Sequence, residues 1–145
     1  MLDIIDLWSD LKVNYGVERS VTNYLNLDNP NVYKYVFSYT GGSPYKSVPG
    51  VGAYHTEELV YLFDWDVPLK TEEERYIRKL MVTLWSNFIK FGDPTPDYGK
   101  SSWLPTNLVT RPYLNIDVES EMKNHVYHKR MAFWELIWTA YEQYV

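Results

Sequence analysis

The sequence has 145 residues, of which 46% are hydrophobic and 17% aromatic, and its formal net charge is -5. This length suffices for one domain with one core, and the apolar content is that of a folded protein rather than a disordered tail. A negative chain without a basic stretch is not expected to bind nucleic acid. Cysteine is absent, which excludes disulfides, zinc–thiolate sites and cysteine nucleophiles within these residues.

Targeting signals are equally sparse. The first eight residues include Asp3 and Asp6 and no basic cluster, so they do not resemble a signal peptide. No apolar run approaches the roughly 20 residues of a membrane span. We therefore expect a soluble protein. The lack of cysteine and of Asn-x-Ser/Thr sequons fits a reducing compartment without proving one, which leaves cytoplasmic and secreted locations both open.

The chain opens with an apolar segment and a predicted helix. Residues 4–11 are mostly apolar, and Ser9 and Asp10 offer capping or turn chemistry. Residues 17–26 carry apolar side chains at helical spacing, which predicts a helix. The Asn, Asp and Pro of residues 26–31 are expected to end it.

A strand-like segment then leads to a lone histidine. In residues 31–39, Tyr and Phe alternate closely enough to predict a strand, and a Gly-, Ser- and Pro-rich loop over residues 40–49 follows. His55 lies between glycines and an acidic, then apolar, run. Thr56 is predicted to cap a short helix or turn over residues 57–63. A base on such a loop suits hydrolytic chemistry, and an ordinary surface turn is the alternative.

The clearest predicted element is a helix that opens at Thr71. Thr71 and Glu74 have the spacing of a capping box, in which each side chain bonds the other residue's free backbone N–H. Gly92 is expected to end the helix and Pro94 to prevent its resumption. The apolar residues between these signals follow helical spacing: Ile77, Leu80, Met81, Leu84, Trp85 and Phe88.

The last third is predicted to contain a hairpin and a helix. A loop over residues 93–107, which Trp103 is expected to anchor, precedes two short strands over residues 112–117 and 121–126. Residues 127–144 have helical periodicity. Their apolar stripe comprises Met131, Trp134, Ile137, Trp138 and Tyr141. Several amphipathic helices with so few strands need a further surface to cover, which favours a part of a larger domain.

Several blocks of this sequence together resemble the C-terminal part of the type-B carboxylesterase and cholinesterase family. Residues 16–20 have the character of an insect-type carboxylesterase. The blocks that carry the resemblance, in order, are residues 31–37, 52–59 with Leu62 and Phe63, 81–94, Trp103 with Pro105, 113–116 and 130–134. The resemblance covers almost the whole chain.

The resemblance implies an α/β fold, namely the C-terminal fragment of an α/β-hydrolase fold with one core strand, a short β-hairpin and several amphipathic helices. Residues 1–145 would form the C-terminal part of a single domain whose upstream part carries the nucleophile. The sequence itself has no Gly-x-Ser-x-Gly elbow, because the segment Gly41-Gly42-Ser43-Pro44 lacks the later glycine and precedes a loop.

The implied activity is carboxylic ester hydrolysis by a Ser-Glu/Asp-His triad through an acyl-enzyme. His55 matches the triad histidine, which acts as general base toward serine and then as general acid toward the departing alcohol. The substrate would be a small-molecule ester. No cofactor or metal is expected, because such a triad needs neither. This chain alone is expected to be inactive, since the nucleophile and the triad acid lie outside it.

Other candidate residues have competing interpretations. Glu58 matches an acidic position of the family and has two interpretations, a supporting group near the histidine or a helix-start carboxylate. Tyr54 and Tyr61 either touch the pocket or simply pack, with packing favoured. His125 and His128 are interpreted as solvated surface rather than metal ligands.

Three further expectations remain open at this stage. Asp10 is assigned a structural role only. The helices over residues 71–91 and 131–144 either pack on the parent domain or form a homodimer contact, which the resemblance implies because members of this family often pair through the corresponding helices. The alternative functions are a non-catalytic, esterase-like adhesion or binding protein and an inactive truncated remnant.

Overall fold

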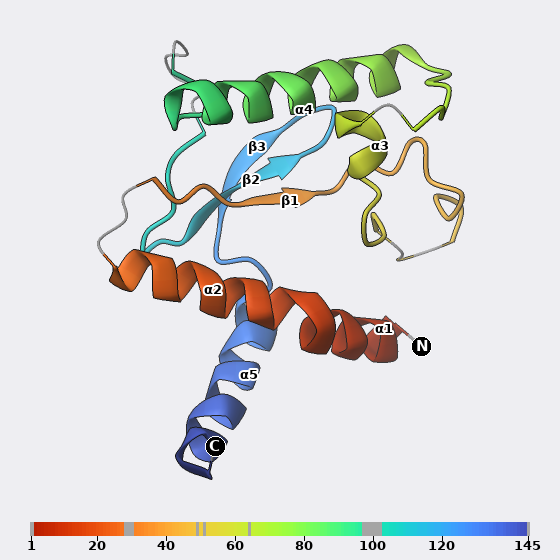
Figure 1. Cartoon of the computed structure of the whole chain (residues 1–145). Coiled ribbons are helices and arrows are strands. Elements are labelled where there is room, and N and C mark those ends of the chain that lie inside the picture. Colours follow the sequence, from red (N-terminus) through yellow and green to blue (C-terminus); the bar gives the residue numbers. More distant parts are fainter. Residues whose placement is uncertain are drawn as a thin grey trace.

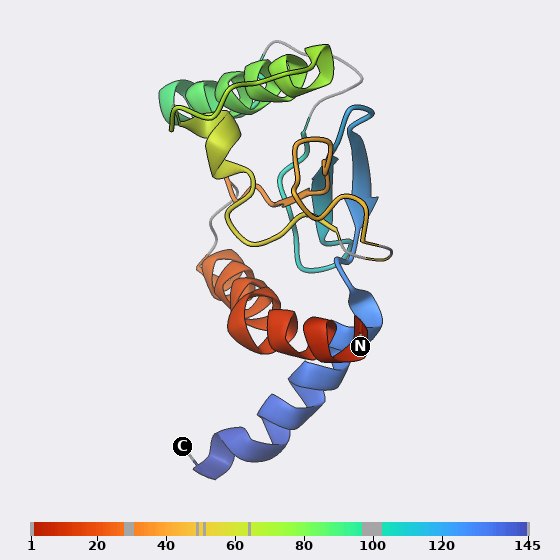
Figure 2. The ribbon, with the colours of Figure 1, turned by 90° about the vertical axis from the view of Figure 1, so that its right-hand side faces the viewer.

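The computed structural model describes residues 2–27, 31–48, 50, 52–63, 65–96 and 103–144. The elements, in chain order, are α1 (Leu2–Ser9), the π-helical η1 (Asp10–Asn14), α2 (Tyr15–Asn26), β1 (Tyr35–Phe37), α3 (Leu59–Leu62), α4 (Glu72–Phe91), β2 (Pro112–Ile116), β3 (Glu121–Asn124), α5 (His128–Tyr141) and the 3-10 turn η2 (Glu142–Tyr144). Figures 1 and 2 show the sheet between α4 on one side and the α1–α2 run on the other, with α5 leading away below α2. Helices therefore cover both faces of the sheet, as in α/β proteins.

The sheet is mixed and has the order β1-β2-β3. β1 pairs in parallel with β2, with Tyr35 opposite Leu114, and β2 pairs antiparallel with β3, with Leu114 opposite Met122. The predicted hairpin over the last third of the chain is thus confirmed. Among the described residues β1 pairs with β2 alone, so its second edge is open.

The predicted strand over residues 31–39 is longer than the observed β1, which spans only Tyr35–Phe37. Residues 31–34 lie outside the strand, and part of their hydrogen bonding is to the loop that follows α4. The Val32 carbonyl accepts the Thr106 N–H at 2.8 Å. The Lys34 carbonyl accepts both the Leu114 N–H at 2.9 Å and the Trp103 indole N–H at 3.0 Å. These bonds also confirm Trp103 as the anchor of its loop.

The chain does not turn at Ser9 and Asp10, contrary to the capping or turn chemistry expected there. α1, η1 and α2 run on without a break, and neither residue makes a side-chain cap. The Ser9 hydroxyl donates instead to the Ile5 carbonyl at 2.8 Å, which a helix tolerates. The predicted helix over residues 17–26 is confirmed as the second half of this run.

α4 begins and ends where the sequence predicts. The Thr71 side chain accepts the Glu74 N–H, and the Glu74 side chain accepts the Thr71 N–H, which completes the capping box. The helix ends at Gly92, whose φ of 69° is the left-handed conformation that glycine adopts without strain. One face of α4 is buried in the core together with Tyr61 and Ile116, and its members are Ile77, Met81 and Leu84.

The last predicted helix is confirmed as α5, although it begins at His128 rather than Tyr127, which has a φ of 45°. Part of its stripe faces the N-terminal helices, where Trp134 and Trp138 each lie 6.4 Å from the Tyr15 ring, measured between centroids, whereas Tyr141 is 64% exposed. Parts of two predicted segments, residues 28–30 of the first break and 97–102 of the long loop, lie outside the described residues.

Candidate active site: the turn that carries His55

His55 lies on a tight turn beyond the carboxyl end of β1. Figure 1 shows the chain leaving β1, passing through a long loop and returning into α3. The Tyr54 carbonyl accepts the Glu57 N–H at 3.1 Å, which closes a four-residue turn over residues 54–57. In open α/β sheets, ligands bind outside the carboxyl ends of the strands. The turn therefore has the place in the fold that a catalytic group needs.

The role predicted for Thr56 is wrong. Thr56 is not an N-cap, because its φ of 73° places it in the left-handed region inside the turn. The helix α3 begins only at Leu59, and its N-terminal flanking residue, Glu58, makes no side-chain cap. A β-branched residue with this φ is a genuine outlier, so the surrounding structure must hold the turn.

The His55 side chain is exposed. Among the described residues, no side chain or backbone group hydrogen-bonds its ring. Within the described residues, both ring nitrogens are therefore without a hydrogen-bond partner, and an imidazole in this state can accept or donate a proton.

The carboxylate of Glu57 is buried beneath the turn, with 3% of the residue exposed. It accepts the Tyr54 N–H at 2.9 Å. Burial raises the pKa of this carboxyl, while the bonds from the Tyr54 N–H and the Ser43 side chain act in the opposite direction. Sequence reasoning missed Glu57 as a site residue. The sequence feature that could have indicated it is an acidic residue three positions after the first residue of a turn, which is the spacing of the acidic residue in a capping box.

Glu58 acts electrostatically on Tyr35 of β1. It is half-buried, and its charge adds to the effect of burial, which raises the pKa of the Tyr35 phenol to about 12. No bond joins Glu58 to His55 in the described part of the chain.

The two candidate tyrosines differ in environment. Tyr61 is 2% exposed and belongs to the core, so packing explains it. Tyr54 is 40% exposed and packs edge-on against Tyr45, with 5.8 Å between the ring centroids. It lies next to His55 in the turn, at the surface.

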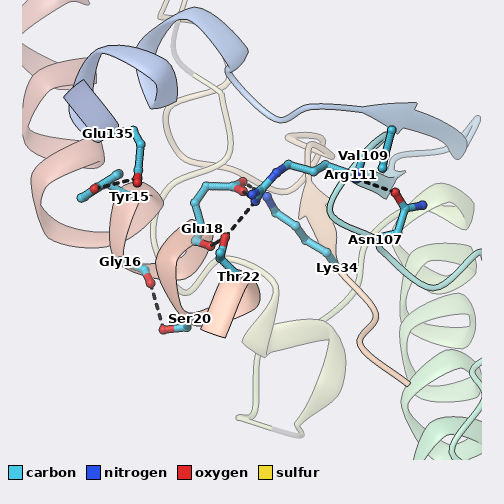
Figure 3. Close-up of polar contacts among 10 residues, drawn as sticks. All are labelled: Tyr15, Gly16, Glu18, Ser20, Thr22, Lys34, Asn107, Val109, Arg111 and Glu135. Atoms are coloured by element: carbon cyan, nitrogen blue, oxygen red, sulfur yellow. Dashed lines mark hydrogen bonds and ion pairs between the residues drawn. The ribbon is translucent and has the colours of Figure 1, made fainter. Parts of the chain in front are cut away.

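The remaining histidines lie elsewhere, near the junction of β3 and α5. The His125 and His128 rings are 5.1 Å apart. They line a cavity of about 500 Å³ together with Glu18, Arg111 and Glu135. Within the described ranges, no group of three His, Cys, Asp or Glu residues is placed to hold a metal. Figure 3 shows the polar contacts beside this cavity, including the ion pairs that join α2 to Lys34 and Arg111.

Asp10 has the structural role expected of it. It is 2% exposed. It accepts from the Arg130 guanidinium at 2.8 Å and from the Trp134 indole at 3.3 Å, which ties η1 to α5. It lies on the helical layer away from the turn that carries His55.

Comparison with known proteins decides the family. The model of the "Carboxylesterase family" matches residues 2–134, which include the β1 segment, the histidine turn and both strands of the hairpin. The chain belongs to the carboxylesterase family. Its fold is accordingly that of the α/β-hydrolases, of which these residues form a part.

Several relatives in this family have named activities. Bovine bile salt-activated lipase is 27% identical over 94% of this chain and 24% of its own length. The mouse bile salt-activated lipase is 32% identical over 70% of the chain and 18% of its own length. Juvenile hormone esterase from Tribolium castaneum is 29% identical over 63% of the chain and 18% of its own length. The chain thus spans a quarter or less of the length of these relatives.

A solved structure is also similar. A PNB esterase aligns with 68% of this chain and 20% of its own, at 25% identity and a TM-score of 0.55.

Among the helices that the structure describes, none is long and apolar enough to cross a membrane.

Proposed function

We propose that this chain is part of a carboxylic ester hydrolase and that His55 is its proton-transferring residue. The observation that carries the proposal is the exposed His55 ring, which has no hydrogen-bond partner among the described residues, on a turn beyond the carboxyl end of β1 and within the stretch that matches the family. Loops held by a rigid scaffold are where catalytic groups gather. The names of the relatives, a lipase and two kinds of esterase, support ester hydrolysis.

The proposed reaction follows the serine triad. A serine hydroxyl attacks the ester carbonyl while one nitrogen of the His55 ring takes the serine proton. The imidazolium then gives that proton to the alkoxide of the leaving alcohol, and an acyl-enzyme remains. Water repeats the sequence, with His55 again first base and then acid. An acidic side chain bonds the other ring nitrogen and stabilises the imidazolium.

The serine and the acid belong to the rest of the domain in this proposal. Residues 1–145 are the C-terminal part of a single α/β-hydrolase domain. The open edge of β1 supports this arrangement, because a strand of the remaining part can pair with it and bring its own loop beside the histidine turn. The substrate class is a small-molecule carboxylic ester. The isolated chain is expected to show no turnover.

The test is His55→Ala in the complete protein that contains this sequence, assayed with a simple aryl ester. We expect kcat/KM to fall at least about a thousandfold, since loss of a triad member costs several orders of magnitude. His128→Gln is the matched control and is expected to keep full activity, because His128 is exposed at the start of α5.

Turnover of His55→Ala within about tenfold of the unchanged protein contradicts the assignment of His55. A folded, unchanged protein that cleaves no aryl ester contradicts ester hydrolysis and favours the non-catalytic binding protein instead.

A further inference from the structure

The turn that carries His55 is closed twice between the same two residues. The Glu57 N–H donates to the Tyr54 carbonyl at 3.1 Å, and the Tyr54 N–H donates to the Glu57 carboxylate at 2.9 Å. A glutamate that reaches back three residues to a backbone N–H is half of a capping box. His55 and Thr56 are the two residues enclosed by this pair of bonds.

The backbone of the enclosed residues needs these two hydrogen bonds to keep its shape. Thr56 has a φ of 73°, a conformation that a β-branched side chain disfavours. A turn of this kind does not hold itself in shape, and strained backbone persists only where its surroundings over-determine it. The Glu57 carboxylate supplies that constraint directly under the strained peptide.

Glu57 is itself fixed from below. The Ser43 side chain, 4% exposed, lies near enough to the Glu57 carboxyl to lower its pKa, and its hydroxyl accepts the Tyr45 N–H at 3.2 Å. The loop that carries Ser43 packs closely on the core, because a Cβ added to Gly42 would lie 2.7 Å from the Tyr61 hydroxyl oxygen. The Glu57 carboxylate thus lies beside a loop that packs closely on the core.

We infer that Glu57 is a positioning residue of the proposed ester hydrolysis, which holds the turn so that the His55 ring keeps its orientation toward the reacting groups. This inference rests on the proposed function of His55. In the described part of the chain no hydrogen bond joins Glu57 to the His55 ring, and the Glu57 carboxylate accepts the Tyr54 N–H. Its effect on catalysis is therefore through geometry, to which proton transfer is sensitive.

The test compares two neutral replacements of Glu57 in the complete protein. Glu57→Gln keeps a carbonyl oxygen that accepts the Tyr54 N–H, whereas Glu57→Met fills a similar volume without an acceptor. We expect Glu57→Gln to keep kcat within about threefold. Glu57→Met is expected to lose about 10- to 100-fold in kcat with KM within twofold, because misplacement of a catalytic group affects the chemical step.

A second-site change separates positioning from general loss of structure. Thr56→Gly removes the disfavoured φ of a β-branched residue, so the turn keeps its shape with less help from Glu57. In the Glu57→Met background, Thr56→Gly is expected to restore kcat several-fold. Glu119→Ala is the control for loss of an acidic residue, since Glu119 is exposed in the turn between β2 and β3, and it should leave kcat unchanged.

The outcomes distinguish this inference from the proposed function. Full activity of His55→Ala overturns the role of His55, and the role of Glu57 with it. An inactive His55→Ala together with unchanged kcat in a folded Glu57→Met overturns the role of Glu57 alone. Equal losses in Glu57→Gln and Glu57→Met also overturn it, because they would show that the charge matters rather than the bond to the Tyr54 N–H.

Discussion

At the scale of single residues, the least expected feature is a buried ion-pair cluster beside the sheet. Lys34, 7% exposed, pairs with the Glu18 carboxylate. Arg111 approaches the same carboxylate at 3.4 Å and donates to the Thr22 hydroxyl at 3.0 Å (Figure 3). The Tyr-rich strand pattern places Lys34 among aromatic residues, and nothing local indicates that α2 supplies its partner. Removing these charged groups from water costs free energy, so the stability of the folded protein depends on which of them are ionised.

Lys34 makes stability depend on pH. Burial lowers the pKa of Lys34 from 10.5 to about 8, and the nearby Arg111 charge acts in the same direction. Because the folded-state pKa is the lower one, the unfolded chain binds more protons between these values. The free energy of unfolding therefore rises as the pH increases from about 8 toward 10, by at most about 3 kcal/mol.

Lys34→Met is expected to remove this rise, since the Glu18 carboxylate stays paired with Arg111. The measurement is the midpoint of thermal unfolding of the complete protein at pH 7.5 and at pH 9.5. The change between the two pH values is compared between the variant and the unchanged protein. Lys79→Met, which removes an exposed lysine on α4, should keep the original pH dependence. A pH dependence that is the same in both variants would show that Lys34 is not its source.

At the scale of elements, a single buried carboxylate ties the N-terminal helices to α5. Asp10 accepts from the Asn14 amide at 2.9 Å on its own helical run and from Arg130 at 2.8 Å on α5. Arg130 also reaches Asp6 at 2.7 Å. Asp10 is a buried charged residue inside a continuous helical run. It is tolerated there because its hydrogen-bond partners come from the next helical turn, Asn14, and from α5, Arg130.

Asp10→Asn is expected to destabilise the protein by about 2 kcal/mol, because Arg130 loses its buried counter-charge. The effect is measured as a lower midpoint of thermal unfolding. The double variant Asp10→Asn, Arg130→Met should lose less stability than the sum of the losses of the two single variants. Each single change leaves the charge of the other residue without this partner, whereas the double change removes both charges. Strict additivity of the two changes would contradict a direct coupling. Glu119→Gln serves as the exposed, unpaired control.

Elements also differ in how far the sequence predicts them. α4 was predicted to both ends, because its signals are local: a reciprocal cap at Thr71 and Glu74, a 3.6-residue stripe and a left-handed Gly92. β1 was predicted too long, because the number of residues in a ladder depends on the neighbouring strand. β2 spans only Pro112–Ile116. Of the residues before β1, Val32 bonds Thr106 of the loop, and Lys34 shares its carbonyl between Leu114 of β2 and Trp103 of the loop.

At the scale of the whole molecule, several apolar side chains remain exposed on the outer faces of the helices. On α5, Phe133 is 54% exposed and Leu136 is 73% exposed. Trp138 already packs within the chain, since the Arg19 guanidinium lies over its ring at 4.4 Å from the ring centroid. The expected homodimer contact through α4 and α5 therefore depends more on Leu136 than on Trp138, while packing on the rest of the domain remains the alternative.

Leu136→Asp tests the dimer in the complete protein. If two copies pair through α5, a buried charge in the contact is expected to shift the sedimentation coefficient from that of a dimer to that of a monomer. Val109→Asp, which changes a residue that is 80% exposed before β2, is the control and should leave sedimentation unchanged. Identical sedimentation of both variants and the unchanged protein removes this contact.

The sequence by itself determined the features that depend on near neighbours. These are the capped helix α4, the hairpin of β2 and β3, the helical character of α5 and the several short blocks that resemble the family, whose match covers residues 2–134. Each rests on residues within a few positions of one another, whose spacing fixes the backbone or makes a recognisable pattern.

Only the tertiary structure decided which polar groups are buried and what they hold. The helical run through Asp10 depends on Arg130, which is 120 residues away along the chain. The cluster of Lys34 depends on α2 and on Arg111, and the burial of Glu57 depends on the loop of Ser43. Desolvation and charge pairing act through space, so they appear only when distant segments pack together. The scaffold of the histidine turn is therefore a property of the fold, while its histidine is a property of the sequence.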